Sequence, residues 1–262
     1  MKTHVFKLPS GVECEVKELM GKHQRMLTEH TNKNLSENLN DVLVDIIVRV
    51  GSKKNIDREF VLSMLSADRK KILVEVRQFT MDFEPTFEFV YEYLDSNGKH
   101  QEEELSIDIS EGFPTKPLMV IDNDGVVEAS YEEYDQIKRE IELELPRSKD
   151  KIKFSLLDGK GERHAMTVAK SKRSSHTSIE MRNPRILKKS TKEGGDDIWI
   201  QANLDTFSFK DISYLRATIK EVEGAVDTEV MIEHPDAENR EDKEVTVDLV
   251  SVLAFFFPSE AI

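Results

Sequence analysis

The sequence predicts an α+β fold: an N-terminal β-hairpin and a helical block, followed by β-hairpins and a C-terminal α+β unit. Three observations predict it. Apolar residues recur at helical spacing in the first third of the chain. The pattern then changes to alternation between turn-forming residues, which is typical of hairpins. One long, capped helical segment returns in the last third, ahead of two candidate strands.

The length and composition indicate a folded chain with an extensive polar surface. The 262 residues are enough for one large domain or two ordinary ones, and 38% are hydrophobic against 34% charged. We divide the chain into residues 1–81 (hairpin and helical block), 82–146 (acidic β-hairpin region with a short helix) and 147–262 (α+β region with a basic loop at 170–197). No apolar run approaches the roughly 20 residues of a membrane span, and the first residues lack the apolar core of a secretory signal.

The first region begins with a predicted hairpin. Residues 4–8 and 12–16 flank Pro9-Ser10-Gly11, in which proline presets one turn dihedral and glycine permits a positive φ. Helical spacing follows over three stretches, which are residues 19–27, 39–50 and 60–65, and Gly51 is placed to end the second. Ser66 is then expected to cap a fourth helix with Asp68 in its first turn.

The second region predicts a long hairpin and a short helix. Aromatic residues at 87, 89, 91 and 93 alternate with Glu88, Val90, Glu92 and Leu94. The turn 95–98 then leads to a return strand that includes residues 105 and 107. The sequence Ser130-Tyr131-Glu132-Glu133 fits a capping box, so we expect a helix from there to about Ile141.

The third region predicts another hairpin, a basic loop and a capped helix. Residues 152–156 and 164–168 are expected to pair, and 170–197 show almost no apolar periodicity. Ser208 is expected to cap a helix that ends at Gly224. Strands at 226–232 and 245–249 then lead to the phenylalanine run near the end of the sequence.

Charge is distributed unevenly along the chain. The formal net charge is −14; residues 84–144 hold 18 acidic against 4 basic residues, and residues 221–248 hold 11 against 2. Residues 160–192 reverse the sign, with 10 basic against 2 acidic. This basic segment lacks interleaved aromatic residues on which bases could stack, so it predicts a protein contact or a solvated loop and not a nucleic-acid site.

Two segments are therefore candidate interaction surfaces. One is the basic segment, because of its charge. The other is the phenylalanine run at 255–257, because several exposed phenylalanines would be costly in water. For the phenylalanines, packing of a final strand into its own domain is an equal alternative. If the basic segment only docks partners, deleting residues 170–192 should leave the thermal midpoint nearly unchanged. The candidate residues are Arg182, Arg185, Lys188, Lys189, Phe255, Phe256, Phe257 and Pro258.

The motifs that usually signal catalysis or metal binding are missing from the sequence. There is no phosphate-binding loop, nucleophile elbow or His-Glu-x-x-His pattern, and His23 and His30 lie roughly 10 Å apart on a helix, too far to share a metal ion. We therefore expect no enzymatic activity, no catalytic, cofactor-binding or metal residues, and no small-molecule substrate. Cys14 is the only cysteine, which excludes an intramolecular disulfide and favours a cytoplasmic origin.

Several segments, taken together and in this order, resemble the hub subunit or hub assembly protein of T-even-type baseplates in contractile-tailed bacteriophages. The resemblance is scattered over most of the chain but does not include 170–197. The segments are the Leu-Pro-Ser-Gly of 8–11, the Asp-Arg helix of 68–77 with its second arginine, the Glu-Leu-Pro of 144–146 with the strand 152–157, and 207–224 followed by His234-Pro235, a Val-Asp-Leu strand and residues 255–258.

The resemblance implies a non-enzymatic structural component of the tail baseplate, or a factor that assembles it, with other baseplate or tail subunits as partners. It implies location in the virion after assembly and in the host cytoplasm before, with no membrane or nucleic-acid partner. Relatives of this kind often carry Cys-x-x-Cys on the strand after the Asp-Arg helix, whereas residues 87–93 contain no cysteine. We therefore expect aromatic cross-strand pairs, and no metal, to hold this hairpin.

Two other functions remain open at this point. The acidic blocks also fit a host-directed binding or regulatory protein that imitates a polyanion. An enzyme with an unrecognised acidic site is the weaker alternative, because acidic residues are abundant but nothing selects a general acid–base pair.

Overall fold

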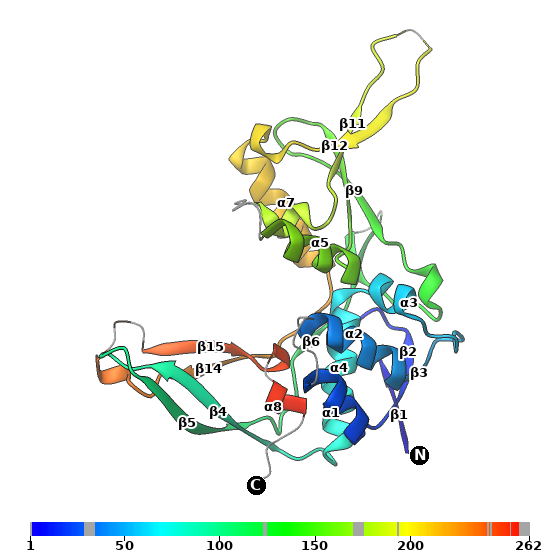
Figure 1. The fold of residues 1–262 in the computed structure, drawn as a ribbon. Coiled ribbons are helices and arrows are strands. Elements are labelled where there is room, and N and C mark those ends of the chain that lie inside the picture. The colour runs from blue at the N-terminus through cyan, green and yellow to red at the C-terminus, as the bar shows by residue number, and fades with distance from the viewer. Residues whose placement is uncertain are drawn as a thin grey trace.

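The α+β class predicted from the sequence is confirmed by the computed structural model, which describes residues 2–28, 35–122, 125–169, 176–192, 194–239, 241, 243–251 and 253–256 (Figure 1). Its sheets are antiparallel, and its buried apolar residues form one continuous cluster that draws on all three predicted regions.

The N-terminal hairpin is confirmed and gains a third strand. Strands β1 (Thr3–Lys7) and β2 (Glu13–Lys17) pair as expected, and β2 also pairs with β3 (Ile47–Val50). The predicted helix over 39–50 is therefore wrong in its last four residues. Ile47, Val48 and Val50 are β-branched residues that fit a half-buried strand, and Gly51, at φ +56°, turns the chain after it.

The helical block contains α1 (Gly21–Thr28), α2 (Leu35–Ile46), α3 (Arg58–Ser63) and α4 (Ser66–Thr80). The predicted cap of α4 is wrong, because Ser66 is already the first helical residue and Leu65 stands at the cap position without a side-chain bond. Instead, the Leu65 N–H donates to the Tyr134 hydroxyl at 2.7 Å. The first helical N–H, of Ser66, likewise donates to the Leu157 carbonyl at 2.9 Å, so residues distant in the sequence supply acceptors at the start of α4.

The long hairpin of the second region is confirmed as β4 (Thr86–Leu94) and β5 (His100–Asp108). Short strands β6 (Thr115–Lys116), β7 (Met119–Asp122) and β8 (Gly125–Glu128) follow. The helix predicted from Ser130 to Ile141 is wrong: this stretch forms a 3₁₀ turn at Tyr134–Gln136 and then enters β9 (Glu140–Glu144). Burial of the Tyr134 ring and pairing of Ile141 with Phe154 outweigh the local capping signal.

The third region contains a four-stranded sheet in the order β12-β11-β10-β9, with β10 (Lys151–Ser155), β11 (Arg185–Lys188) and β12 (Ile198–Gln201). The predicted pairing of 152–156 with 164–168 is wrong, because the latter residues lie in α5 (Gly159–Ala169). Segment 170–197 is not a loop throughout: it holds α6 (Thr177–Glu180) and β11, an interior strand. Residues 170–175 of this segment lie outside the described residues.

The last helix is confirmed as α7 (Phe209–Val222), whose cap Ser208 accepts a hydrogen bond from the Asp211 N–H. Strands β13 (Ala225–Val226), β14 (Glu229–Glu233) and β15 (Glu244–Asp248) follow near the predicted positions. Residues Leu253–Phe256 form a short helix, α8, and not the continuation of a strand. α8 lies beside the base of β4 (Figure 1).

Candidate functional site: an acidic arm

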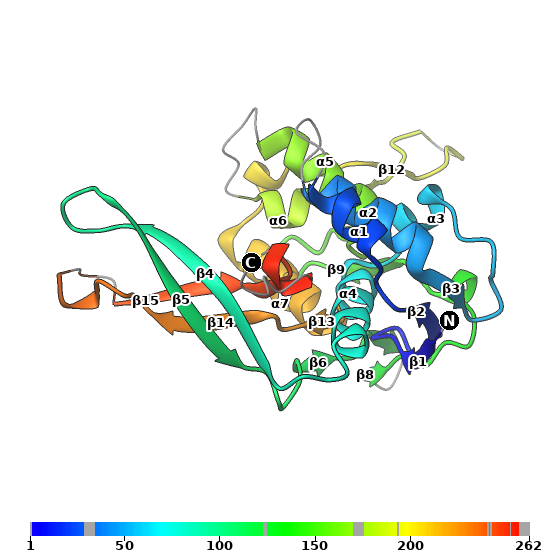
Figure 2. The same ribbon diagram turned by 60° about the horizontal axis from the view of Figure 1, so that its bottom comes forward.

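Two hairpins far apart in the sequence lie side by side and project from the body as one arm, which consists of residues 86–108 and 229–248 (Figures 1 and 2). Near the tip, the Ser96 N–H donates to Asp236 Oδ2 at 2.8 Å. Behind it, the buried His234 ring packs edge-on against Tyr91 and Tyr93 at centroid distances of 6.0 and 4.8 Å. These contacts join the two hairpins along the projecting part of the arm.

The inner face of β4–β5 is aromatic, but not in the way the sequence suggests. The predicted aromatic cross-strand pairs are wrong: Phe87 stacks on Phe89 and Tyr91 on Tyr93 within β4, at 5.2 and 5.8 Å between centroids. Their cross-strand partners on β5 are not aromatic. Because residues two apart share a strand face, the four rings form one row along the arm. The partners, in order, are Ile107, Leu105, Glu103 and Gln101.

Arg77 of α4 fixes the base of this row to the body. Its side chain is fully buried, its Nε donates to the Phe255 carbonyl at 3.1 Å, and its guanidinium lies over the rings of Phe87 and Phe255 at 5.8 and 5.4 Å. Burial lowers the pKa of Arg77 because the charged form loses solvent. The second arginine of the 68–77 segment thus links α4, α8 and the arm.

The outer faces of the arm carry like charges directly opposite one another. On β4–β5 Glu92 pairs with Glu102, and on β14–β15 Glu233 pairs with Glu244; all four residues are exposed. No salt bridge joins them to a cation in the described part of the chain. Such pairs are unfavourable by up to about 1 kcal/mol each, so the arm keeps a repulsion that a cationic partner would relieve.

Most of the net charge of the protein belongs to this arm. Residues 86–108 contain seven acidic residues and one lysine, and 229–248 contain eight acidic and two basic residues, which gives −12 of the total −14. Exposed apolar side chains lie among the carboxylates, namely Val90 and Leu94 on one outer face and Met231, 71% exposed, on the other. The sequence predicted both acidic blocks but not that they pack against one another. Alternation of residues along a strand indicates the two faces of that strand and says nothing about which distant hairpin lies beside it.

Two of the predicted interaction residues are arginines that are paired within the chain. Arg182 is buried and donates through Nε and Nη2 to the two carboxylate oxygens of Glu223, at 2.6 and 2.5 Å. Arg185 of β11 donates to Glu140 of β9, across the intervening strand β10. The first contact joins α6 to the end of α7, and the second joins two strands of one sheet, so both act inside the fold.

The remaining predicted residues divide between surface and core. Lys188 and Lys189 are exposed at the end of β11, whereas Phe255 and Phe256 are buried in the protein's own core. Phe257 and Pro258 lie outside the described residues. Because 170–192 includes β11 and Arg182, its deletion removes an interior strand and a buried ion pair. We therefore expect that deletion to lower the thermal midpoint.

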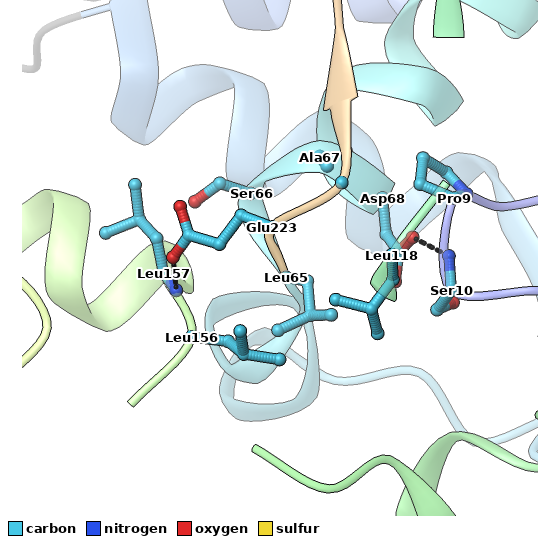
Figure 3. A pocket seen from close by; sticks show the side chains of 11 residues that line it. Pro9, Ser10, Leu65, Ser66, Ala67, Asp68, Leu118, Leu156, Leu157 and Glu223 are labelled. Atoms are coloured by element: carbon cyan, nitrogen blue, oxygen red, sulfur yellow. Dashed lines mark hydrogen bonds between the residues drawn. The ribbon is translucent and has the colours of Figure 1, made fainter. Parts of the chain in front are cut away.

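A cavity of about 90 Å³ lies where the N-terminal turn, the start of α4 and the end of α7 meet (Figure 3). Leucines form much of its wall, and the hydroxyls of Ser10 and Ser66 are buried without a hydrogen-bond partner among the described residues. Glu223 contributes to the wall but is already bound by Arg182 and by the Leu157 N–H. Its volume suits a few waters and is well below the roughly 300 Å³ of an ordinary ligand pocket.

Asp68, beside this cavity, is buried and accepts hydrogen bonds from the Ser10 N–H at 3.0 Å and the Tyr134 hydroxyl at 2.8 Å. These bonds favour the carboxylate, but desolvation outweighs them and raises the pKa of Asp68 from 3.8 to about 6. The folded state therefore holds the proton more tightly than the unfolded chain. The resulting stabilisation is present below about pH 4 and is lost as the pH rises through about 6.

Asp68→Asn should remove this pH dependence while keeping an acceptor for the Ser10 N–H. We expect the difference in unfolding free energy between wild type and variant to change by about 2 kcal/mol between pH 4 and 7, in the direction that favours the wild type at low pH. Denaturant melts of both proteins at half-unit pH intervals would measure it. A difference that stays flat across this range would contradict a raised pKa at Asp68.

The described residues contain no group of three or more His, Cys, Asp or Glu side chains placed to hold a metal ion. In the same ranges, no helix combines the length and hydropathy that a membrane span requires. Comparison of the chain with protein-family models, curated proteins and solved structures finds no match.

Proposed function

We propose that this protein is a non-enzymatic component of a contractile phage tail baseplate, or a factor that assembles the baseplate hub, and that it acts through protein–protein contacts. The order of the segments that resemble baseplate hub proteins supports the family assignment. The observation that carries the contact function is the arm, which presents two acidic outer faces and concentrates a charge of −12 in 43 residues.

The arm binds a partner with a basic surface. Opposed glutamates on each outer face are unfavourable in the free protein, and lysines or arginines of a partner would remove that repulsion on binding. Val90, Leu94 and Met231 would then supply apolar contact area within the charged rim. Other baseplate subunits are the partners that this proposal names.

Quantitative mass spectrometry of purified, salt-washed particles tests the assignment. A fixed ratio to a known baseplate protein supports a structural subunit. Abundance in infected cells and in hub assembly intermediates, with absence from particles, supports an assembly factor. Absence from both particles and intermediates would overturn the proposal.

The double variant Glu92→Lys/Glu102→Lys tests the arm itself. It exchanges one like-charged pair for another, so the stability of the hairpin should change little, while the sign of the charge on the outer face reverses. We expect affinity for the baseplate partner to fall by about tenfold or more. The control Glu128→Lys/Glu180→Lys makes the same change in net charge at exposed positions outside the arm and should bind nearly normally.

A host-directed acidic binding protein is the alternative that the same arm favours. A pure charge mimic would lose its partner steeply between about 0.05 and 0.5 M salt, because exposed charges are screened beyond a few ångströms at high ionic strength. Retention of most of the affinity at high salt would favour the mixed apolar and acidic contact that we propose for baseplate assembly.

A further inference from the structure

In the part of the chain that the structure describes, strand β12 is an open edge of the four-stranded sheet. It pairs with β11 on one side, in the register Ile186 with Ile200 and Lys188 with Ile198. The Ala202 N–H donates to the Pro184 carbonyl at 2.9 Å, so Ala202 directs its backbone groups toward β11. Alternation along an antiparallel strand then directs the backbone groups of Ile200 and Ile198 inward and those of Trp199 and Gln201 toward the free edge.

The side chains on this edge are apolar where a protected edge would be charged. Ile198 is 57% exposed and Ile200 38% exposed, and both lie on the same face of the sheet. The strand Ile198–Gln201 contains no lysine, proline or bulge, which are the usual devices that keep an edge from pairing. The four-residue length is the one feature that limits such pairing.

The β11–β12 hairpin is accessible to another molecule. Figure 1 shows that strands β11 and β12 project from the body at a position distant from the acidic arm. A strand added to this edge would therefore meet neither the arm nor the helical block of the same chain.

We propose that β12 pairs antiparallel with β12 of a second copy of this chain, with Trp199 on the two-fold axis. Only residues whose backbone groups point outward can exchange the ladder hydrogen bonds, which restricts the register to Trp199 opposite Trp199 or opposite Gln201. With Trp199 on the axis, Ile198 lies opposite Ile200 of the second copy. All four exposed isoleucines then meet on one face, and the two sheets become one eight-stranded sheet.

A second copy fits this edge better than an unrelated strand because the edge is self-complementary. Two-fold pairing places Asp197 opposite Gln201, so no like charges face one another across the contact. The apolar face of one edge covers the same apolar face of the other. This inference is independent of the proposed baseplate function, since it concerns the chain alone.

Sedimentation equilibrium of the full chain over a range of concentrations tests the proposal. We expect a reversible transition from 30.1 kDa to twice that mass. Ile200→Lys should raise the dissociation constant by about tenfold or more, because a lysine would then face the partner strand. The control Phe209→Lys, at an exposed apolar residue of α7 outside both the arm and this edge, should not. A monomer at all concentrations, or a dimer unchanged by Ile200→Lys, would overturn the proposal.

Cysteine cross-linking tests the register. The only native cysteine, Cys14, is fully buried and should not react. An equimolar mixture of Ile198→Cys and Ile200→Cys proteins should form a disulfide-linked dimer faster than either protein alone, because only the mixture places two cysteines directly opposite. Equal rates in all three samples would overturn the assignment of Trp199 to the axis.

Discussion

Phe255→Ala is expected to lower the free energy of unfolding by about 3–5 kcal/mol. The ring is fully buried and packs edge-on against Phe87, Phe113 and Phe256, with centroid distances of 5.3 to 5.8 Å. Its removal leaves a cavity at the base of the arm and exposes one face of the Arg77 guanidinium. Urea unfolding monitored by circular dichroism would measure the loss.

Phe209 provides the matched control, because it is the same residue type at 82% exposure on the first turn of α7. Phe209→Ala should change the stability by no more than about 0.5 kcal/mol. If Phe255→Ala were equally mild and instead abolished assembly, the phenylalanine run would be an interface and its burial in this fold would be wrong.

Arg182→Ala is expected to destabilise the protein by about 3 kcal/mol. The guanidinium makes a bidentate contact with Glu223, whose carboxylate also accepts from the Leu157 N–H at 2.8 Å. Truncation leaves a largely buried carboxylate without its cation, and breaking such a pair is more costly than never forming it. The thermal midpoint and urea unfolding would both report the change.

Two variants separate the contribution of the Arg182–Glu223 hydrogen bonds from that of the positive charge alone. Lys189→Ala removes a cation of the same segment from an exposed site and should be nearly neutral. Arg182→Lys retains the charge but cannot make two parallel hydrogen bonds, so it should recover only part of the stability. If the Arg182→Ala variant keeps the stability of the wild type and loses only partner binding, the prediction is wrong and Arg182 is a docking residue.

The elements predicted correctly are those whose signals are local. The N-terminal hairpin follows from the Pro-Ser-Gly turn between alternating segments, and the β4–β5 hairpin follows from the turn at 95–98. Ser208 stands three residues before Asp211, and this spacing is sufficient for the cap of α7. Each of these features depends on contacts within a few residues, or directly across a tight turn.

The wrong predictions concern segments whose conformation is decided by distant residues. Residues 47–50 continue a helical pattern in the sequence but pair with β2 as a strand. Residues 130–141 begin with a capping box, but the Tyr134 hydroxyl in this stretch donates to Asp68 and its ring is buried. In each case burial of apolar side chains is worth more than the local propensity, which amounts to less than about 1 kcal/mol per residue.

The α+β class, the two acidic blocks and the strand periodicity that gives each arm hairpin two distinct faces follow from local patterns in the sequence. The union of these blocks in one arm depends instead on tertiary contacts such as Ser96 with Asp236, 140 positions apart. Tertiary contacts also pair Arg182 and Arg185 with carboxylates of the same chain, while Lys188 and Lys189 stay exposed. Charge and periodicity are properties of neighbouring residues, whereas pairing and burial depend on which distant segments pack together.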